Sequence, residues 1–196
     1  MEFDGTFELE EVTTEEVWFA LSDPVMIKQS LPGCQFLLEV DEEAPDFDEL
    51  RERAPDEDPP TIPEADPDDI SERAFYQGGR YAALIEVSVG SVSPSFETVV
   101  TISEREFPEM RASGEGGASD SSFEMNSWMG LEGTDDGVAV EWRAETDVYG
   151  RIARMGQRVM NPVANRIVNR FFNNVADRVS DVRENRTLRD RIQGFV

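Results

Sequence analysis

Residues 138–182 read VAVEWRAETDVYGRIARMGQRVMNPVANRIVNRFFNNVADRVSDV, and their hydrophobic period changes in the middle. Before Gly150, apolar residues such as Val138, Val140 and Trp142 alternate with charged residues, which is typical of a half-buried strand. After Gly150, apolar residues recur at every third or fourth position, from Ile152 through Phe171 to Val182. This spacing predicts a long amphipathic helix. The chain therefore ends in a strand that leads directly into a long helix.

The same alternation occurs upstream of this stretch. It predicts strands over 81–89, 96–102, 110–114 and 123–131, an extended run over 34–40, and a first strand near 6–9, with a hairpin loop over 133–137. Two short helices are expected after the first strand. Thr13 and Glu16 form a potential capping box for one of them, and Asp23-Pro24 is suited to begin the other.

This order of elements predicts an α+β fold. A curved antiparallel sheet of about seven strands has one apolar face that must be covered. The C-terminal helix is the only predicted element long enough to cover it. We therefore expect the sheet to wrap around this helix, with an internal space between them.

The composition excludes several kinds of active site. The 196 residues include no histidine and one cysteine, Cys34, so neither a histidine-dependent catalytic triad nor a histidine or thiolate metal site is expected. The formal net charge of -24 argues against nucleic acid as a partner. No apolar run approaches the length of a transmembrane helix, and no signal peptide is recognised, so a cytoplasmic protein is expected.

Lys28 is the only lysine, and the chain contains 42 acidic residues but only 18 basic ones. Such a surface repels itself in dilute salt, whereas molar salt screens the repulsion. We therefore predict a halophilic cytosolic protein of haloarchaeal type; the alternative is an acidic mesophilic protein with a disordered tract.

The charge is unevenly distributed. Residues 41–73 carry a net charge of -12 and six of the 11 prolines, and their sparse apolar residues predict a flexible insert, with a short helix near 47–53. We interpret the insert as a solvated loop or, alternatively, as a docking tether. Residues 151–196 carry ten arginines and four acidic residues, which makes this end basic. The expected organisation is one domain over 1–182, interrupted by 41–73, and an arginine-rich tail over 183–196.

Several short motifs occur in this order along the chain: Phe3-Asp4-Gly5, Val17-Trp18, Leu21-Ser22-Asp23-Pro24, Leu31-Pro32-Gly33-Cys34, Val89-Gly90-Ser91-Val92, Gly150-Arg151-Ile152-Ala153, Gly156 and Phe171-Phe172. Together they resemble the CoxG family of carbon monoxide dehydrogenase subunits, within the START-like helix-grip (SRPBCC) superfamily. The resemblance covers 1–40 and 74 to about 182. The 41–73 insert and the short arginine-rich tail depart from the family pattern.

The resemblance implies a helix-grip fold with a cavity for an apolar small molecule. It also implies an accessory role that links molybdenum-containing carbon monoxide dehydrogenase, or a related hydroxylase, to the membrane and its quinones. The expected function is therefore non-catalytic binding of a quinone or isoprenoid-like lipid, with no covalent cofactor. The alternatives are an adaptor for a molybdenum hydroxylase without a ligand of its own and, third, a cyclase- or hydrolase-type enzyme.

The alternation and the helical period together predict which residues face the internal space. We expect a ligand cavity, with a closed core of the same residues as the alternative. The predicted set is Phe36, Leu38, Tyr81, Ala83, Ile85, Phe96, Val100, Met110, Phe123, Met125, Met129, Trp142, Met155, Val159, Met160, Val163, Ile167 and Phe171.

No catalytic residue is predicted, because the inward polar candidates Tyr81, Thr98, Ser127 and Thr146 have no partner acid or base that the sequence can place. Cys34 is expected to be a small buried residue rather than a reactive thiol. The tail offers a peripheral contact with the inner face of the membrane or with a partner, although a fraying helix end explains the same pattern. The residues of that predicted contact are Arg186, Leu188, Arg189, Ile192 and Phe195.

Overall fold

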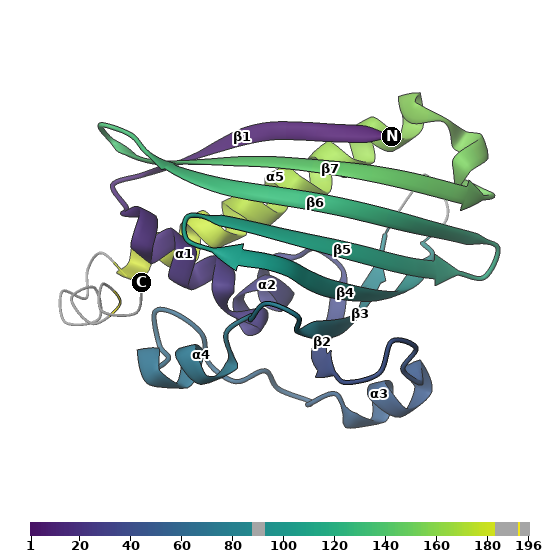
Figure 1. The fold of residues 1–196 in the computed structure, drawn as a ribbon, viewed down its shortest axis with the longest axis horizontal. Coiled ribbons are helices and arrows are strands. Elements are labelled where there is room, and N and C mark those ends of the chain that lie inside the picture. The colour runs from purple at the N-terminus through teal and green to yellow at the C-terminus, as the bar shows by residue number, and fades with distance from the viewer. Residues whose placement is uncertain (88–92, 183–191, 193–196) are drawn as a thin grey trace.

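The computed structural model describes residues 1–87, 93–182 and 192. Seven strands form one antiparallel sheet in the order β1-β7-β6-β5-β4-β3-β2. They are β1 (Glu2–Glu10), β2 (Cys34–Val40), β3 (Arg80–Glu86), β4 (Ser95–Glu106), β5 (Glu109–Ala118), β6 (Ser121–Gly133) and β7 (Gly137–Gly150). Figure 1 shows the long helix α5 (Gln157–Val182) crossing one face of this sheet. The predicted fold class is thereby confirmed.

Two short helices, α1 (Thr14–Ser22) and α2 (Pro24–Ser30), connect β1 to β2. Thr13 Oγ1 accepts a hydrogen bond from the Glu16 backbone N–H at 3.3 Å, and Glu16 Oε2 accepts one from the Thr13 N–H at 2.8 Å. The predicted capping box is therefore formed. Asp23 caps α2 through the Val25 N–H at 2.9 Å, with Pro24 at the helix start, as expected.

The main hydrophobic core lies where the C-terminal half of α5 meets the sheet and α1. Phe172, Val175 and Val179 of α5 are buried there. Phe172 stacks on Phe7 of β1, with ring centroids 5.2 Å apart. Full burial of such side chains stabilises the fold by about 1.5–3 kcal/mol each, so this end of α5 anchors the helix to the sheet.

The insert over 41–73 is packed against the domain, contrary to the expectation that it has too few apolar residues to bury. It forms α3 (Phe47–Arg53), where a helix was predicted, and α4 (Pro67–Arg73). Leu50 of α3 is buried in a second cluster with residues of β2 and β3, whereas Ile62 and Ile70 are buried in the main core. A few apolar residues, widely spaced in the sequence, are therefore enough to pack the insert, because each joins a cluster that the rest of the domain has already formed.

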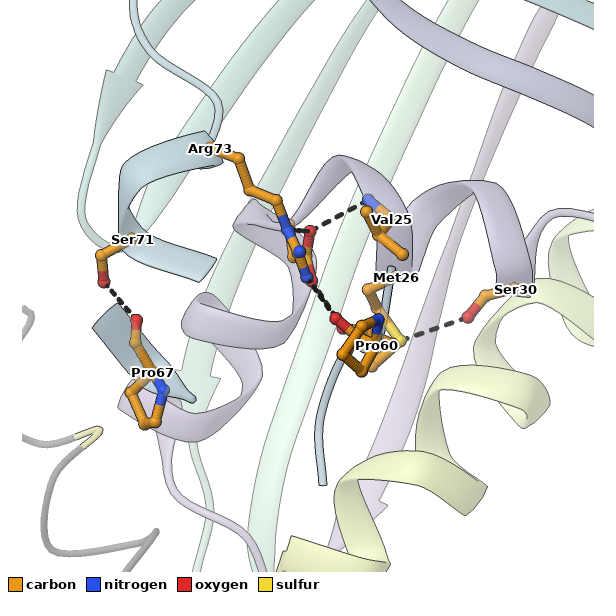
Figure 2. A network of polar contacts seen from close by, with 9 residues as sticks. Val25, Met26, Ser30, Pro60, Pro67, Ser71 and Arg73 are labelled. Atoms are coloured by element: carbon orange, nitrogen blue, oxygen red, sulfur yellow. Dashed lines mark hydrogen bonds and ion pairs between the residues drawn. The ribbon is translucent and has the colours of Figure 1, made fainter. Parts of the chain in front are cut away.

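A buried carboxylate attaches the insert to α2 (Figure 2). The Asp23 side chain is fully buried and accepts hydrogen bonds from Thr61 Oγ1 at 2.5 Å and from Arg73 Nε and Nη2, both at 2.8 Å. Arg73 Nη2 also donates to the Pro60 carbonyl at 2.7 Å. A bidentate arginine–carboxylate pair is among the stronger polar contacts in proteins. Through Thr61 and Arg73, the network therefore holds two separate points of the insert against Asp23.

Strand β2 corrects two of the predicted cavity residues. Its pairing with β3 shifts register between Cys34 and Phe36, so that Cys34 lies opposite Ile85 but Phe36 lies opposite Leu84. Because an extra residue in one strand reverses the side-chain alternation beyond it, Phe36 and Leu38 lie on the outer face of the sheet. There they pack in the cluster that contains Leu50, and the cavity prediction for both residues is wrong.

The tail prediction is also changed at one residue. Ile192 is fully buried in the main core cluster, so it is not available for a membrane or partner contact. Arg186, Leu188, Arg189 and Phe195 lie outside the described residues.

Candidate functional site

An apolar pocket lies between the concave face of the sheet and the N-terminal half of α5. Its volume is about 210 Å³, and the atoms that face the space are apolar. It is lined from the sheet, from the short 3-10 helix η1 (Ile152–Met155) and from α5. The lining residues are Met1, Phe3, Ile85, Val87, Phe96, Thr98, Phe123, Met125, Thr146, Val148, Ile152, Met160, Val163, Ala164 and Ile167.

The pocket exists because α5 is buried unevenly along its length. Met160, Val163 and Ile167 line the pocket and remain half-buried, whereas Phe172, Val175 and Val179 of the same helix are buried. The two groups have the same helical spacing and face the same sheet. The apolar stripe of α5 thus continues beyond the part that the core fills, and its N-terminal half faces open space.

The floor of the pocket depends on a close contact between aromatic rings and a glycine. Phe96 and Phe123 meet edge to face, with ring centroids 5.8 Å apart. Gly116 of β5 lies beneath Phe123, and a Cβ atom there would come within 2.8 Å of Phe123 Cε1. The same Cβ atom would lie 2.7 Å from Thr98 Oγ1 and 2.8 Å from the Glu97 carbonyl oxygen, so a side chain at this position would force the strand and these neighbours to shift.

Seven of the predicted cavity residues line the pocket: Ile85, Phe96, Phe123, Met125, Met160, Val163 and Ile167. Another seven lie outside its lining, either on the concave face or packed in or against the main core. These are Tyr81, Ala83, Val100, Met110, Met129, Trp142 and Phe171. Both a core and a cavity are therefore present, at different ends of the same interface.

Two predicted helix residues do not face the sheet. Met155 is 37% exposed and Val159 is 41% exposed. The sequence pattern assumed one continuous helix from residue 151, but Gly156 has a φ of 71° and separates η1 from α5. This break separates Met155 from the helical phase of α5. Val159 lies within α5 but to the exposed side of the face that Met160, Val163 and Ile167 turn to the pocket.

The pocket also includes residues that the prediction omitted. Phe3 belongs to the β1 alternation with Phe7 and Leu9, and this signal was available in the sequence. Ile152 begins the apolar period recognised in the sequence but was left out of the predicted cavity set. Ala164, next to Val163 in α5, lies outside that period, and its place in the lining is assigned from the three-dimensional arrangement.

Two threonines are the polar side chains in the lining, Thr98 from β4 and Thr146 from β7. Thr98 is 3% exposed, and its hydroxyl has no hydrogen-bond partner among the described residues. Buried hydroxyls usually have a partner, so Thr98 retains unused hydrogen-bonding capacity beside the pocket.

The described lining contains no acidic or basic side chain. Tyr81 lies in the core rather than in the pocket, where its ring meets Phe75 edge to face at 4.6 Å, and burial raises its pKa to about 12. Burial likewise raises the pKa of the Cys34 thiol to about 12, and its Sγ donates to the Phe36 carbonyl at 3.3 Å. A thiol held in this protonated state is a poor nucleophile.

A second, larger groove of about 840 Å³ lies on the opposite side of the sheet, between α3 and the outer faces of β4 to β6. It is lined largely by polar and charged groups, among them Arg51, Glu97 and Glu115. Such a surface remains hydrated, so the smaller pocket is the better candidate for an apolar ligand.

Within the described residues, no three potential metal-binding side chains lie close enough to hold an ion. In the same part of the chain, no helix combines the length and hydropathy that a bilayer-spanning segment needs.

A seven-stranded antiparallel sheet wrapped around a C-terminal helix, with an apolar pocket between them, defines a helix-grip protein. The family model of CoxG, described as a subunit of carbon monoxide dehydrogenase, matches residues 74–180. The chain belongs to this family of accessory subunits. No curated protein matches the chain.

Solved structures support the same fold. A conserved protein from Geobacillus kaustophilus is 17% identical, with a TM-score of 0.68 over 92% of this chain and 96% of that one. A protein from Thermus thermophilus is 10% identical, with a TM-score of 0.56 over 93% and 99% of the two chains. The ZhuI aromatase/cyclase from a Streptomyces species is also 10% identical, with a TM-score of 0.55 over 92% and 93%.

Proposed function

We propose that the protein is a non-catalytic binding protein that holds part of an apolar small molecule, a quinone or an isoprenoid-like lipid, between the sheet and α5. The observation that carries this proposal is the pocket itself. Half of the apolar stripe of α5 faces a space of about 210 Å³ instead of packed side chains. An unfilled apolar surface of this kind is a favourable site for an apolar ligand.

The pocket size favours partial enclosure of the ligand. Pockets that enclose a drug-sized molecule usually have volumes of roughly 300–1,000 Å³, so this one accommodates a compact ring or one end of a longer chain. Adaptable methionines, Met125 and Met160, line it and suit a ligand of variable shape. The hydroxyl of Thr98 offers one hydrogen bond to a carbonyl or hydroxyl group on the enclosed portion.

The family supports a proposal for the cellular role. Membership in the CoxG family supports a place beside a carbon monoxide dehydrogenase or a related molybdenum hydroxylase, where an apolar carrier would link the enzyme to the membrane. A catalytic role is disfavoured because a cyclase or hydrolase needs an acid or base at the substrate, and the described pocket lining offers none.

Extraction of the purified protein with organic solvent, followed by mass spectrometry, tests the proposal directly. We expect a co-purifying lipid, or a rise in Tm when a short-chain quinone is added to the stripped protein, because a ligand that binds only the native state stabilises it. No extracted lipid together with no quinone-dependent shift in Tm would reject the proposal.

A further inference from the structure

The exposed side of α5 is basic, although the chain as a whole is acidic. Residues 148–176 contain five arginines and no aspartate or glutamate, in a chain with 42 acidic residues and a net charge of -24. Three of these arginines are exposed on α5 at intervals of eight and four residues, which places them along one stripe about 18 Å long. They are Arg158, Arg166 and Arg170.

Asparagines occupy the positions beside these arginines. Asn165, Asn169 and Asn173 follow one another at four-residue spacing and are exposed on the same side of α5. We call these six residues the basic stripe. Within the described residues no ion pair involves its arginines, whereas other arginines bind carboxylates, among them Arg51, Arg73, Arg80 and Arg111.

The basic stripe does not help α5 to form. A helix is stabilised by acidic residues in its first turn and by basic residues in its last turn, because its N-terminal end carries a partial positive charge. α5 has neither, and Arg158 lies in its first turn. Arg166 and Arg170, one turn apart, also repel each other. A charge pattern that opposes the helix and has no ion pair in the described chain points to a contact with another molecule.

We propose that the basic stripe is a docking surface for an acidic protein. The planar guanidinium group of arginine binds a carboxylate through two parallel hydrogen bonds, and arginine is enriched in protein interfaces whereas lysine is depleted. The asparagine side chains add amide groups that donate hydrogen bonds to carboxylates or backbone carbonyls of the same partner. The stripe therefore combines opposite charge with directional hydrogen bonding.

Two other anionic partners fit the stripe less well. Asparagines rather than apolar side chains lie beside the arginines, so the stripe offers little that would enter the acyl region of a bilayer. A nucleic acid duplex carries one charge about every 1.7 Å along its axis and would extend past the stripe onto the acidic remainder of the molecule, which repels phosphates. A folded protein can present a carboxylate cluster no longer than the stripe.

The basic stripe and the apolar pocket lie on different sides of the same helix. Met160, Val163 and Ile167 line the pocket, whereas the residues of the stripe are exposed and line none of it. A helix with its side chains is about 10–12 Å across, so a protein docked on the stripe would lie about that far from the pocket. The inference does not depend on what the pocket binds.

A helical peptide with glutamates at four-residue spacing serves as the acidic probe, and the same peptide with glutamines is its control. Each is titrated into the full chain labelled with 15N, and NMR spectra both detect weak binding and locate it. In salt of about 0.1 M we expect the glutamate peptide to shift resonances of the basic stripe, and the glutamine peptide to shift them little. The shifts should decline in about 1 M salt, because the Debye length falls from about 10 Å to about 3 Å.

The double variant R166Q/R170Q should bind the glutamate peptide about fivefold more weakly, since each exposed arginine–carboxylate pair contributes roughly two- to threefold. The matched control R53Q/R143Q removes the same charge from two exposed arginines outside the stripe, which also have no ion pair within the described residues. It should leave binding within about twofold. The Tm of R166Q/R170Q should equal or exceed that of the parent, because the repulsion between the two arginines is removed.

Three results would overturn the proposal. The glutamate and glutamine peptides could shift the spectrum equally, R53Q/R143Q could weaken binding as much as R166Q/R170Q, or R166Q/R170Q could lower Tm, which would assign these arginines to stability. Tighter binding of a DNA duplex or of phosphatidylglycerol vesicles to the stripe would also overturn it. Quinone binding by R166Q/R170Q should match that of the parent, so failure of this proposal leaves the proposed ligand untouched.

Discussion

Replacement of Arg73 by methionine tests whether the buried carboxylate of Asp23 attaches the insert to the domain. Asp23 is fully buried, and Arg73 supplies two of the four hydrogen bonds that its carboxylate accepts. Removal of one member of a buried ion pair costs about 3–5 kcal/mol, because the remaining charge stays buried without its partner.

The expected cost for R73M lies at the lower end of that range. The Arg73 side chain is 23% exposed, so water can approach the vacated space, and Thr61 and the Val25 N–H continue to bind Asp23. We predict a loss of about 3 kcal/mol in the free energy of unfolding, which corresponds to a fall in Tm of roughly 6–12 °C for a domain of this size.

Urea and thermal unfolding followed by circular dichroism measure this loss. The matched control is R51M in the same insert, where Arg51 pairs with Asp48 and Glu97 on the exposed surface, and its Tm should remain close to that of the parent. Replacement of Asp23 by asparagine in the R73M background should recover part of the stability, because asparagine keeps the helix cap and removes the charge. A loss below about 1 kcal/mol for R73M, similar to that of R51M, would refute the reasoning.

Three further predictions concern the insert, pH and salt. Leu50→Ala should lower the free energy of unfolding by about 2–5 kcal/mol, because the Leu50 side chain is 1% exposed. Its control, Glu52→Ala on the exposed side of α3, should change that free energy by less than about 0.5 kcal/mol. Equal losses for the two variants in urea unfolding would contradict the packing of α3. The pKa values of Cys34 and Tyr81 are raised by burial from 9 and 10 to about 12, so the native state holds these protons more tightly and stability should fall as pH rises from about 9 to about 12. Cys34→Ala should make stability fall less steeply with pH over this range. An unchanged pH dependence would show that the Cys34 thiol is exposed to water rather than buried. With a net charge of -24, the protein should show a higher Tm in about 1 M NaCl than in about 0.1 M, as a halophilic protein would; a flat or falling Tm would argue for the mesophilic alternative.

Local signals in the sequence were sufficient for most of the fold. The capping box at Thr13 and Glu16 involves residues three positions apart, and the strand alternation is a property of each strand alone. The predicted hairpin at 133–137 joins β6 to β7 for the same reason. Features with short-range causes can be predicted from one sequence because each is decided by neighbouring residues.

The features that were missed depend on distant contacts or on a single change of register. Thr61 and Arg73 bind Asp23 from positions 38 and 50 residues away in the sequence, and no local pattern predicts these pairs. One register shift in β2 placed Phe36 and Leu38 on the outer face, and the break at Gly156 separated Met155 from the helical phase of α5. Each of these errors followed from an assumption that a periodic pattern continues without interruption.

The binding of a soluble short-chain quinone to two matched variants, measured by titration calorimetry, tests the central claim most directly. Val163 lines the pocket, whereas Val159, one helical turn earlier, is exposed outside it. An indole at position 163 would occupy much of a cavity of about 210 Å³. We predict that V163W weakens quinone binding by at least about tenfold, or 1.4 kcal/mol, while V159W leaves it unchanged. Equal affinity in both variants and the parent protein would contradict the assignment of this pocket as the ligand site.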